Sequence, residues 1–129
     1  MSQRPLVVAF HLCEQIVVDD QTRRVSPINC FTRWLIEGPP AEPQTFRAVA
    51  ILASGHGSIP AALTIDPLDT GETIYRREFT VQFADPLKYY WCMLRLRRVV
   101  FPVTGVYQAS LQVGGEGLAS MRFLVFHKE

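Results

Sequence analysis

The chain has 129 residues, of which 48% are hydrophobic and 19% charged, and its formal net charge is +1. This length fits one domain spanning 1–129 with a substantial core, and the composition excludes a disordered chain. The near-neutral charge argues against a nucleic-acid binder, and no apolar run approaches the roughly 18 residues needed to cross a bilayer.

The cysteines and the first residues indicate a cellular compartment. "MSQRPLVVAF" at 1–10 leads into a short apolar run without a small-residue cleavage site, so we expect no signal peptide. Three cysteines, an odd number, fit a reducing compartment better than a secreted disulfide scaffold. We therefore expect a cytoplasmic protein with no membrane association.

Two strands are predicted in the first third of the chain. They cover Leu6–Val18 and Val25–Ile36 and are joined by a polar bend at 19–24, where aspartate side chains can bond to nearby backbone. Pro27 indicates an edge strand or a bulge, because proline cannot donate a ladder hydrogen bond. Apolar residues of the first strand that we expect on one face are Val8, Phe10, Leu12, Ile16 and Val18.

Four more strands follow a proline-rich loop at 37–43. They are predicted over 46–53, 59–65, 74–83 and 89–100. The residues between them are rich in glycine, proline and aspartate, which favour turns. No segment of ten or more residues has the 3.6-residue apolar period of a helix.

The end of the chain predicts a β-hairpin. Residues 106–113 alternate apolar and polar side chains, and 118–126 do the same in return. Between them, "GGEG" at 114–117 supplies glycines that tolerate the positive φ angles of tight turns. In the first of these strands, the residues expected to share the buried face are Tyr107, Ala109, Leu111 and Val113.

About eight short strands at regular spacing predict an all-β fold. An antiparallel β-sandwich of about seven to nine strands is favoured over a closed barrel.

Two stretches carry a resemblance that agrees with this fold. "VVDDQTRRVSPINCF" at 17–31 and "FPVTGVYQASLQVGGEGLASMRFLV" at 101–125 resemble an uncharacterised family of short bacterial proteins of unknown function. The resemblance implies an immunoglobulin-like sandwich. It implies no activity, cofactor or catalytic residue.

One strand predicts a surface with an unusual composition. If Leu94 and Leu96 of "YYWCMLRLRRVV" face the core, then the outward residues are Trp91, Met93, Arg95 and Arg97. Trp, Met and Arg are enriched at protein interfaces, so this row is a candidate interaction surface. The alternative is an ordinary solvated face on which arginine stems cover the sheet. Further arginines that could extend the row are Arg23, Arg24, Arg76 and Arg77.

Two cysteines are expected to be neighbours across the first hairpin. If the chain turns near Gln21 and Thr22, Cys13 and Cys30 face each other. Two reduced thiols packed together, a redox-sensitive disulfide and a shared soft-metal site are the alternatives.

No catalytic or metal site is predicted. His11, His56 and His127 lie in separate segments, and no nucleophile–base motif is present. The carboxylates of "DPLDTGE" at 66–72 do not follow an EF-hand pattern, and the same residues suit an ordinary turn. We expect no catalytic residue, no metal and no cofactor.

The sequence therefore favours a non-enzymatic module that acts by protein–protein interaction, with either an unidentified protein or a homo-oligomer as partner. The alternative function is a small-ligand-binding protein or hydrolase, with a pocket between the sheets or under the turn around His56.

Overall fold

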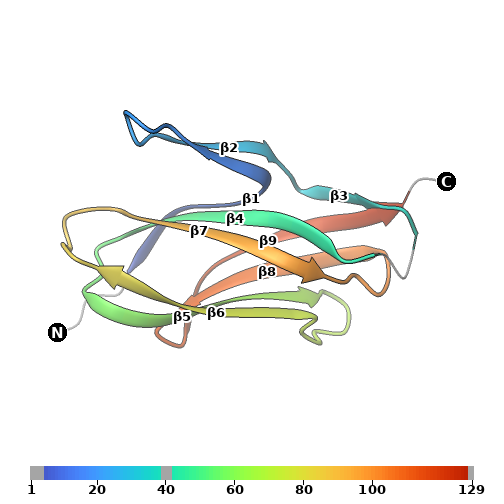
Figure 1. Cartoon of the computed structure of the whole chain (residues 1–129). Helices are drawn as coiled ribbons and strands as arrows, with labels where there is room; N and C mark the ends of the chain where they lie inside the picture. The colour runs from blue at the N-terminus through green and yellow to red at the C-terminus, as the bar shows by residue number, and fades with distance from the viewer. Residues whose placement is uncertain (1–4, 39–41, 128–129) are drawn as a thin grey trace.

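The computed structural model describes residues 5–38 and 42–127 and is built from β-strands in two stacked layers (Figure 1). The strands of the described residues are β1 (Leu6–Val18), β2 (Val25–Cys30), β3 (Arg33–Ile36), β4 (Gln44–Ala53), β5 (Gly57–Pro67), β6 (Tyr75–Phe83), β7 (Tyr90–Val99), β8 (Gly105–Val113) and β9 (Glu116–His127). Among these residues there is no helix with the length and apolar character needed to cross a membrane.

The strand order identifies an immunoglobulin-like sandwich. The first sheet has the order β2-β1-β4-β7, and the second has the order β3-β9-β8-β5-β6. All pairings are antiparallel except β3 with β9. Strands β1, β4 and β7 take the places of A, B and E, while β5, β8 and β9 take those of C, F and G. The all-β, two-sheet fold expected from the sequence is confirmed.

The single strand predicted over 25–36 is wrong, because the chain changes sheets within it. β2 pairs with β1 in the first sheet, whereas β3 pairs with β9 in the second. Phe31 and Thr32 make the crossing, and the Leu124 N–H donates to the Thr32 carbonyl at 2.8 Å. The Phe31 ring packs on Trp34, with ring centroids 4.6 Å apart. Pro27 lies in an edge strand, as its chemistry predicts.

The single face predicted for the apolar residues of the first strand is interrupted. Leu12 is fully buried, but Val8 is 56% exposed. The register of β1 against β4 shifts between Val7 and Ala9, so that a β-bulge at Val8 interrupts the alternation. The far half of β1 pairs with β2, and this hairpin projects from the body of the sandwich (Figure 1).

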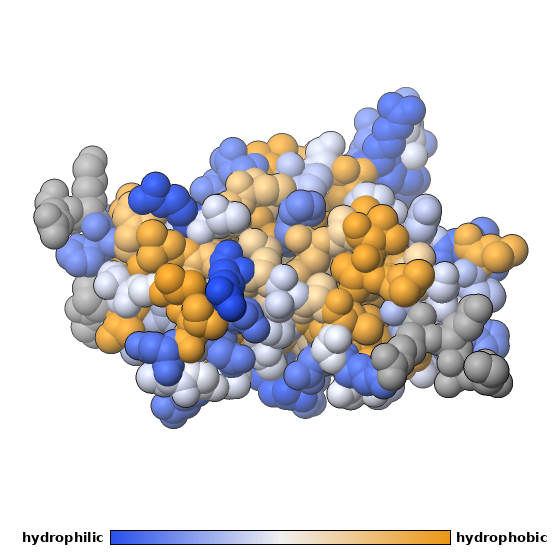
Figure 2. Space-filling model, turned by 180° about the vertical axis from the view of Figure 1, so that it is seen from behind, coloured by the Kyte–Doolittle hydropathy of each residue, from blue (hydrophilic) through white to orange (hydrophobic). Residues whose placement is uncertain are grey.

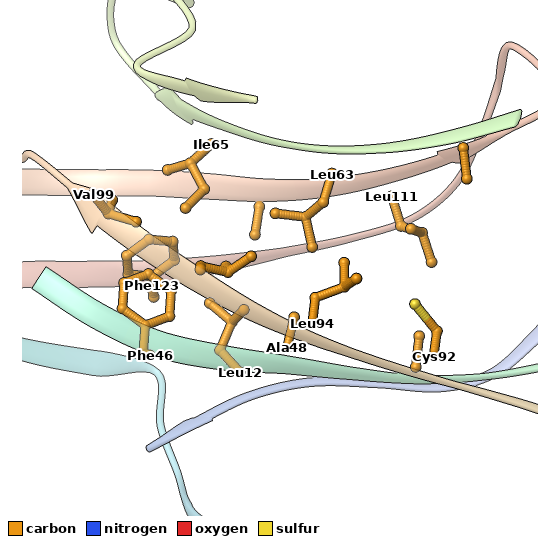
Figure 3. Close-up of a cluster of buried hydrophobic side chains, with 14 of the residues drawn as sticks. Leu12, Phe46, Ala48, Leu63, Ile65, Cys92, Leu94, Val99, Leu111 and Phe123 are labelled. Atoms are coloured by element: carbon orange, nitrogen blue, oxygen red, sulfur yellow. The ribbon is translucent and has the colours of Figure 1, made fainter. Parts of the chain in front are cut away.

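The core lies between the sheets and is built from residues of alternating strand positions (Figure 3). The predicted inward residues of β8 are all buried, and Leu94 and Leu96 of β7 are buried as well. The largest fully buried aromatic side chains are Phe46, Phe101, Tyr107 and Phe123.

Tyr107 closes the connection between β7 and β8. Its ring is 1% exposed, and its hydroxyl donates to the Val103 carbonyl at 2.6 Å. This geometry is the tyrosine corner of immunoglobulin-like domains, in which a tyrosine early in strand F bonds to backbone a few residues upstream. Burial raises the pKa of Tyr107 above its ordinary value, so the phenol stays protonated and able to donate.

Gly55 permits a close approach between the end of β4 and the end of β6. A Cβ built on Gly55 would overlap the ring of Phe83, which is a core residue. The "SGHGS" turn therefore needs its first glycine for space rather than for flexibility. At Gly57 the requirement is different, because its φ is +71°.

The substitution Tyr107→Phe should lower the free energy of unfolding by about 1 kcal/mol, because it removes one buried hydrogen bond and leaves the ring in place. Urea denaturation measures this change. Tyr89→Phe is the matched control, because Tyr89 is 65% exposed and should show no measurable effect. Equal stability of Tyr107→Phe and the parent chain would show that the corner bond contributes nothing.

Gly55→Ala should destabilise the protein by about 1–3 kcal/mol, because the new methyl group forces the Phe83 ring or the β4–β5 connection to move. Thermal unfolding compared with Gly117→Ala measures the effect. No atom lies within 4 Å of a Cβ built on Gly117, so that control should change stability by less than about 0.5 kcal/mol. Similar losses in the two variants would contradict the close packing at Gly55.

Candidate functional site

The four residues predicted to point outward from β7 do so. Along β7, exposed and buried residues alternate from Trp91 to Leu96, with the even-numbered positions in the core. Trp91 is 40% exposed and Met93 is 44% exposed, and Arg95 and Arg97 are exposed beside them. The structure thus places the predicted row on the outer face of the first sheet, along an edge strand.

β4 extends this row into a surface two strands wide. Ile51 lies opposite Trp91, Val49 opposite Met93, and Arg47 opposite Arg95. Val49 itself is only 3% exposed, so it lies beneath this surface. We call the surface formed by the six other residues the basic-apolar face: Arg47, Ile51, Trp91, Met93, Arg95 and Arg97.

Sequence reasoning missed the contribution of β4. Residues 46–53 are apolar almost throughout, which predicts a buried strand but assigns no side chain to the exterior. The continuous apolar run was itself the available signal, because a strand with two apolar faces needs an apolar neighbour on both sides.

The basic-apolar face holds three arginines and no carboxylate. On its β1 side, His11 lies opposite Val49. The Arg47 guanidinium donates to the backbone carbonyl of Glu14 at 2.8 Å, which anchors its side chain across the sheet.

Arg77 of β6 reaches the edge of β7 from the other sheet. Its guanidinium donates to the Arg95 carbonyl at 2.7 Å, so a side chain of β6 covers one backbone acceptor of β7. The other arginines that could have extended the row lie elsewhere. Arg76 pairs with Glu78 at 3.1 Å, and Arg23 and Arg24 lie where β1 turns into β2.

The cysteines occupy two different environments. Cys13 and Cys30 are partners across β1 and β2, as the sequence predicts, and both are free thiols. Cys92 faces the core between the sheets (Figure 3). Burial raises the pKa of the Cys92 thiol to about 12, so it is un-ionised and unreactive at neutral pH.

The residues considered for catalysis or metal binding are spread over the molecule. His11 belongs to β1, His56 precedes β5, and His127 ends β9. Within 5–38 and 42–127, no three His, Cys, Asp or Glu side chains form a group that could hold a metal ion.

The surface pockets of the described residues include the following three. One lies over β5 and β6 near Phe79, one lies beside the Tyr107 corner, and one lies over β8 and β9 near Ser110. Their volumes are about 430 to 460 Å³, and neither His11 nor His56 lines any of the three. These three pockets therefore do not match the inter-sheet site that the alternative function requires.

Apolar residues are also exposed on another side of the molecule. Figure 2 shows the molecule from the side opposite to that of Figure 1, where patches of orange apolar residues alternate with blue polar ones. Leu6 and Val8 of β1 are among the exposed apolar residues of the chain. Apolar exposure alone therefore does not select one face, and the row of arginines is what distinguishes the basic-apolar face.

No family model matches the chain, and no curated protein matches its sequence. Several solved structures are similar in fold, among them these two. One is an immunoglobulin-like protein from Pseudomonas aeruginosa, with 12% identity and a TM-score of 0.43, covering 97% of this chain and 98% of that chain. The other is the alkylpurine DNA glycosylase AlkC of Pseudomonas fluorescens bound to DNA, with 13% identity and a TM-score of 0.41. That match covers 90% of this chain and 30% of the glycosylase chain. At these levels of similarity, neither structure assigns a role to a residue of this chain.

Proposed function

We propose that this chain is a non-catalytic interaction module that binds a partner protein on the basic-apolar face. The observation that carries the proposal is the exposure of Trp91 and Met93 directly beside Arg95 and Arg97. Tryptophan and arginine account for many of the largest single-residue contributions at protein interfaces, and methionine is enriched there.

The fold supports the proposal by holding these side chains on a rigid surface. Cys92, Leu94 and Leu96 are buried in the core, so the residues between them along β7 have fixed backbone positions. A surface that is ordered before binding loses less conformational entropy when the complex forms.

The charges of the face select the chemistry of the partner. Its three arginines favour a partner that carries carboxylates around an apolar centre. The apolar centre would pack on Trp91, Met93 and Ile51, while the carboxylates would pair with the arginines at the rim. Because rim charges mainly set the association rate, binding should weaken as salt increases.

The same charges disfavour self-association through this face. Two copies placed face to face would bring like-charged arginine rows together. Pairing through the free edge of β7 is also hindered. Arg77 covers the Arg95 carbonyl, and Arg98 has a positive φ of 57° at an irregularity of the strand. Such features protect edge strands from added strands. We therefore favour an acidic partner protein over a homo-oligomer.

A cytoplasmic location is part of the proposal, since three free thiols suit a reducing compartment. A nucleic-acid partner is not proposed, because the net charge of +1 is too small for general phosphate binding.

Arg95→Glu and Trp91→Ala should each reduce recovery of the partner at least tenfold, equivalent to about 1.4 kcal/mol of binding free energy or more. The tagged full chain is isolated from cells of its source, and the proteins that accompany it are quantified by mass spectrometry. The controls are Arg122→Glu on β9, which makes the same charge reversal, and Leu68→Ala after β5, which truncates another exposed apolar side chain. Both controls should retain the partner.

Equal recovery of the same proteins by all four variants would show that the basic-apolar face is not the docking surface. Light scattering on the purified chain measures whether it forms a dimer. A dimer that Arg95→Glu and Trp91→Ala both abolish would replace the acidic partner with a second copy of this chain.

A further inference from the structure

The hairpin of β1 and β2 holds two thiols in a register that a tight turn defines. The carboxylate of Asp19 accepts hydrogen bonds from the backbone N–H of Gln21 and of Thr22, at 2.9 and 2.8 Å. These two hydrogen bonds, of which the one from Thr22 has the larger effect, hold the pKa of Asp19 below its ordinary value. From this turn the register continues without a shift to the pair formed by Cys13 and Cys30.

The pair occupies the kind of cross-strand position in which two cysteines can be bridged. Phe31 N–H donates to the Leu12 carbonyl at 3.0 Å, which makes Leu12 and Phe31 a hydrogen-bonded pair. Cys13 and Cys30 are therefore the adjacent non-hydrogen-bonded pair. In a regular ladder the Cα atoms of such a pair lie about 4.5 Å apart. Here the next position is irregular, because Asn29 has a φ of 55° and is not paired with Glu14. Disulfides are formed at Cα separations of about 4.4–6.8 Å.

The two thiols differ in access to solvent. Cys13 is fully buried, whereas Cys30 is exposed. Burial, followed by the nearby Cys30 group, raises the pKa of Cys13 to about 11, and Arg47 offsets part of this rise. A reagent in solution therefore reaches Cys30 first, while Cys13 stays a protonated thiol opposite it on β1.

We propose that Cys13 and Cys30 form a reversible thiol–disulfide modification site that exchanges with small-molecule disulfides such as oxidised glutathione. This inference concerns a different group of residues from the basic-apolar face and does not depend on the proposed function.

The exchange proceeds in two substitutions at sulfur. The Cys30 thiolate attacks one sulfur of oxidised glutathione, forms a mixed disulfide and releases one glutathione thiolate. Cys13 then gives up its proton, and its sulfur attacks the Cys30 sulfur and releases the second glutathione. Two protein thiols are oxidised to one disulfide, one glutathione disulfide is reduced, and the two protons end on two molecules of glutathione.

The product would tie β2 to β1 immediately before the chain crosses to the second sheet. Cys30 is followed directly by Phe31 and Thr32, which make that crossing. The disulfide would close the loop formed by residues 13–30 and restrict the unfolded chain, so the oxidised protein should unfold at a higher temperature than the reduced one.

The test treats the reduced full chain with oxidised glutathione under native conditions, followed by intact mass, thiol titration in denaturant and peptide mapping. The expected product has lost two hydrogen atoms and retains one titratable thiol of three, that of Cys92. Peptide mapping should show Cys13 joined to Cys30, and an excess of reduced glutathione should restore all three thiols.

Single variants separate the two steps. Cys13→Ala should accumulate a stable glutathione adduct on Cys30, because the resolving thiol is gone. Cys30→Ser should form neither the disulfide nor the glutathione adduct, because its two remaining thiols, those of Cys13 and Cys92, are buried. Circular dichroism confirms that each variant is folded, and Cys92 is the internal control in every sample.

Two results would overturn the proposal. One is a parent chain that keeps three thiols under conditions in which Cys13→Ala acquires the adduct. The other is a parent chain that stops at the same glutathione adduct as Cys13→Ala, because Cys13 would then be unable to reach Cys30.

Discussion

Burial of aromatic rings between the two sheets is the interaction on which the rest of the structure depends. Phe46 of the first sheet contacts Phe123 of the second and Phe101 of the β7–β8 connection, with ring centroids 6.4 and 6.3 Å away. Phe101 also meets Tyr107 at 5.0 Å in an edge-to-face arrangement, which aromatic pairs favour. Full burial of each such ring contributes about 1.5–3 kcal/mol. Because the rings come from both sheets, this free energy is gained only when the sheets are stacked.

The stacked core also determines what the exterior presents. Since side chains alternate along a strand, anchoring Leu94 and Leu96 inward necessarily turns Met93 and Arg95 outward. The same rule separates the thiols. Cys92 belongs to the inward phase of β7, whereas Cys13 lies next to the inward-facing Leu12 and meets Cys30 on the neighbouring strand. The surface row and the thiol pair are both consequences of how the interior is packed.

Features that depend on a local pattern of residues are predictable from the sequence alone. The terminal hairpin, the outward row of β7 and the pairing of Cys13 with Cys30 each follow from a period of two and the position of a turn. The break at Phe31 and the bulge at Val8 are not predictable in this way. Both depend on which strand of which sheet lies alongside, and that is decided by contacts between segments far apart in the sequence. The partial exposure of Ile51 depends on a similar choice, because a strand with one face open to solvent and a strand covered on both faces can have the same apolar composition. The identity of a partner depends on a surface outside this chain.

Native-state hydrogen exchange on the variant Phe46→Leu tests most directly whether the two sheets are stabilised as one unit. The substituted residue belongs to β4, but the slowest amides of β4 and β8 should lose the same free energy of protection, because opening either sheet requires the shared interior to open. A loss of protection confined to β4 and its neighbours in the first sheet, with β8 unchanged, would contradict this account.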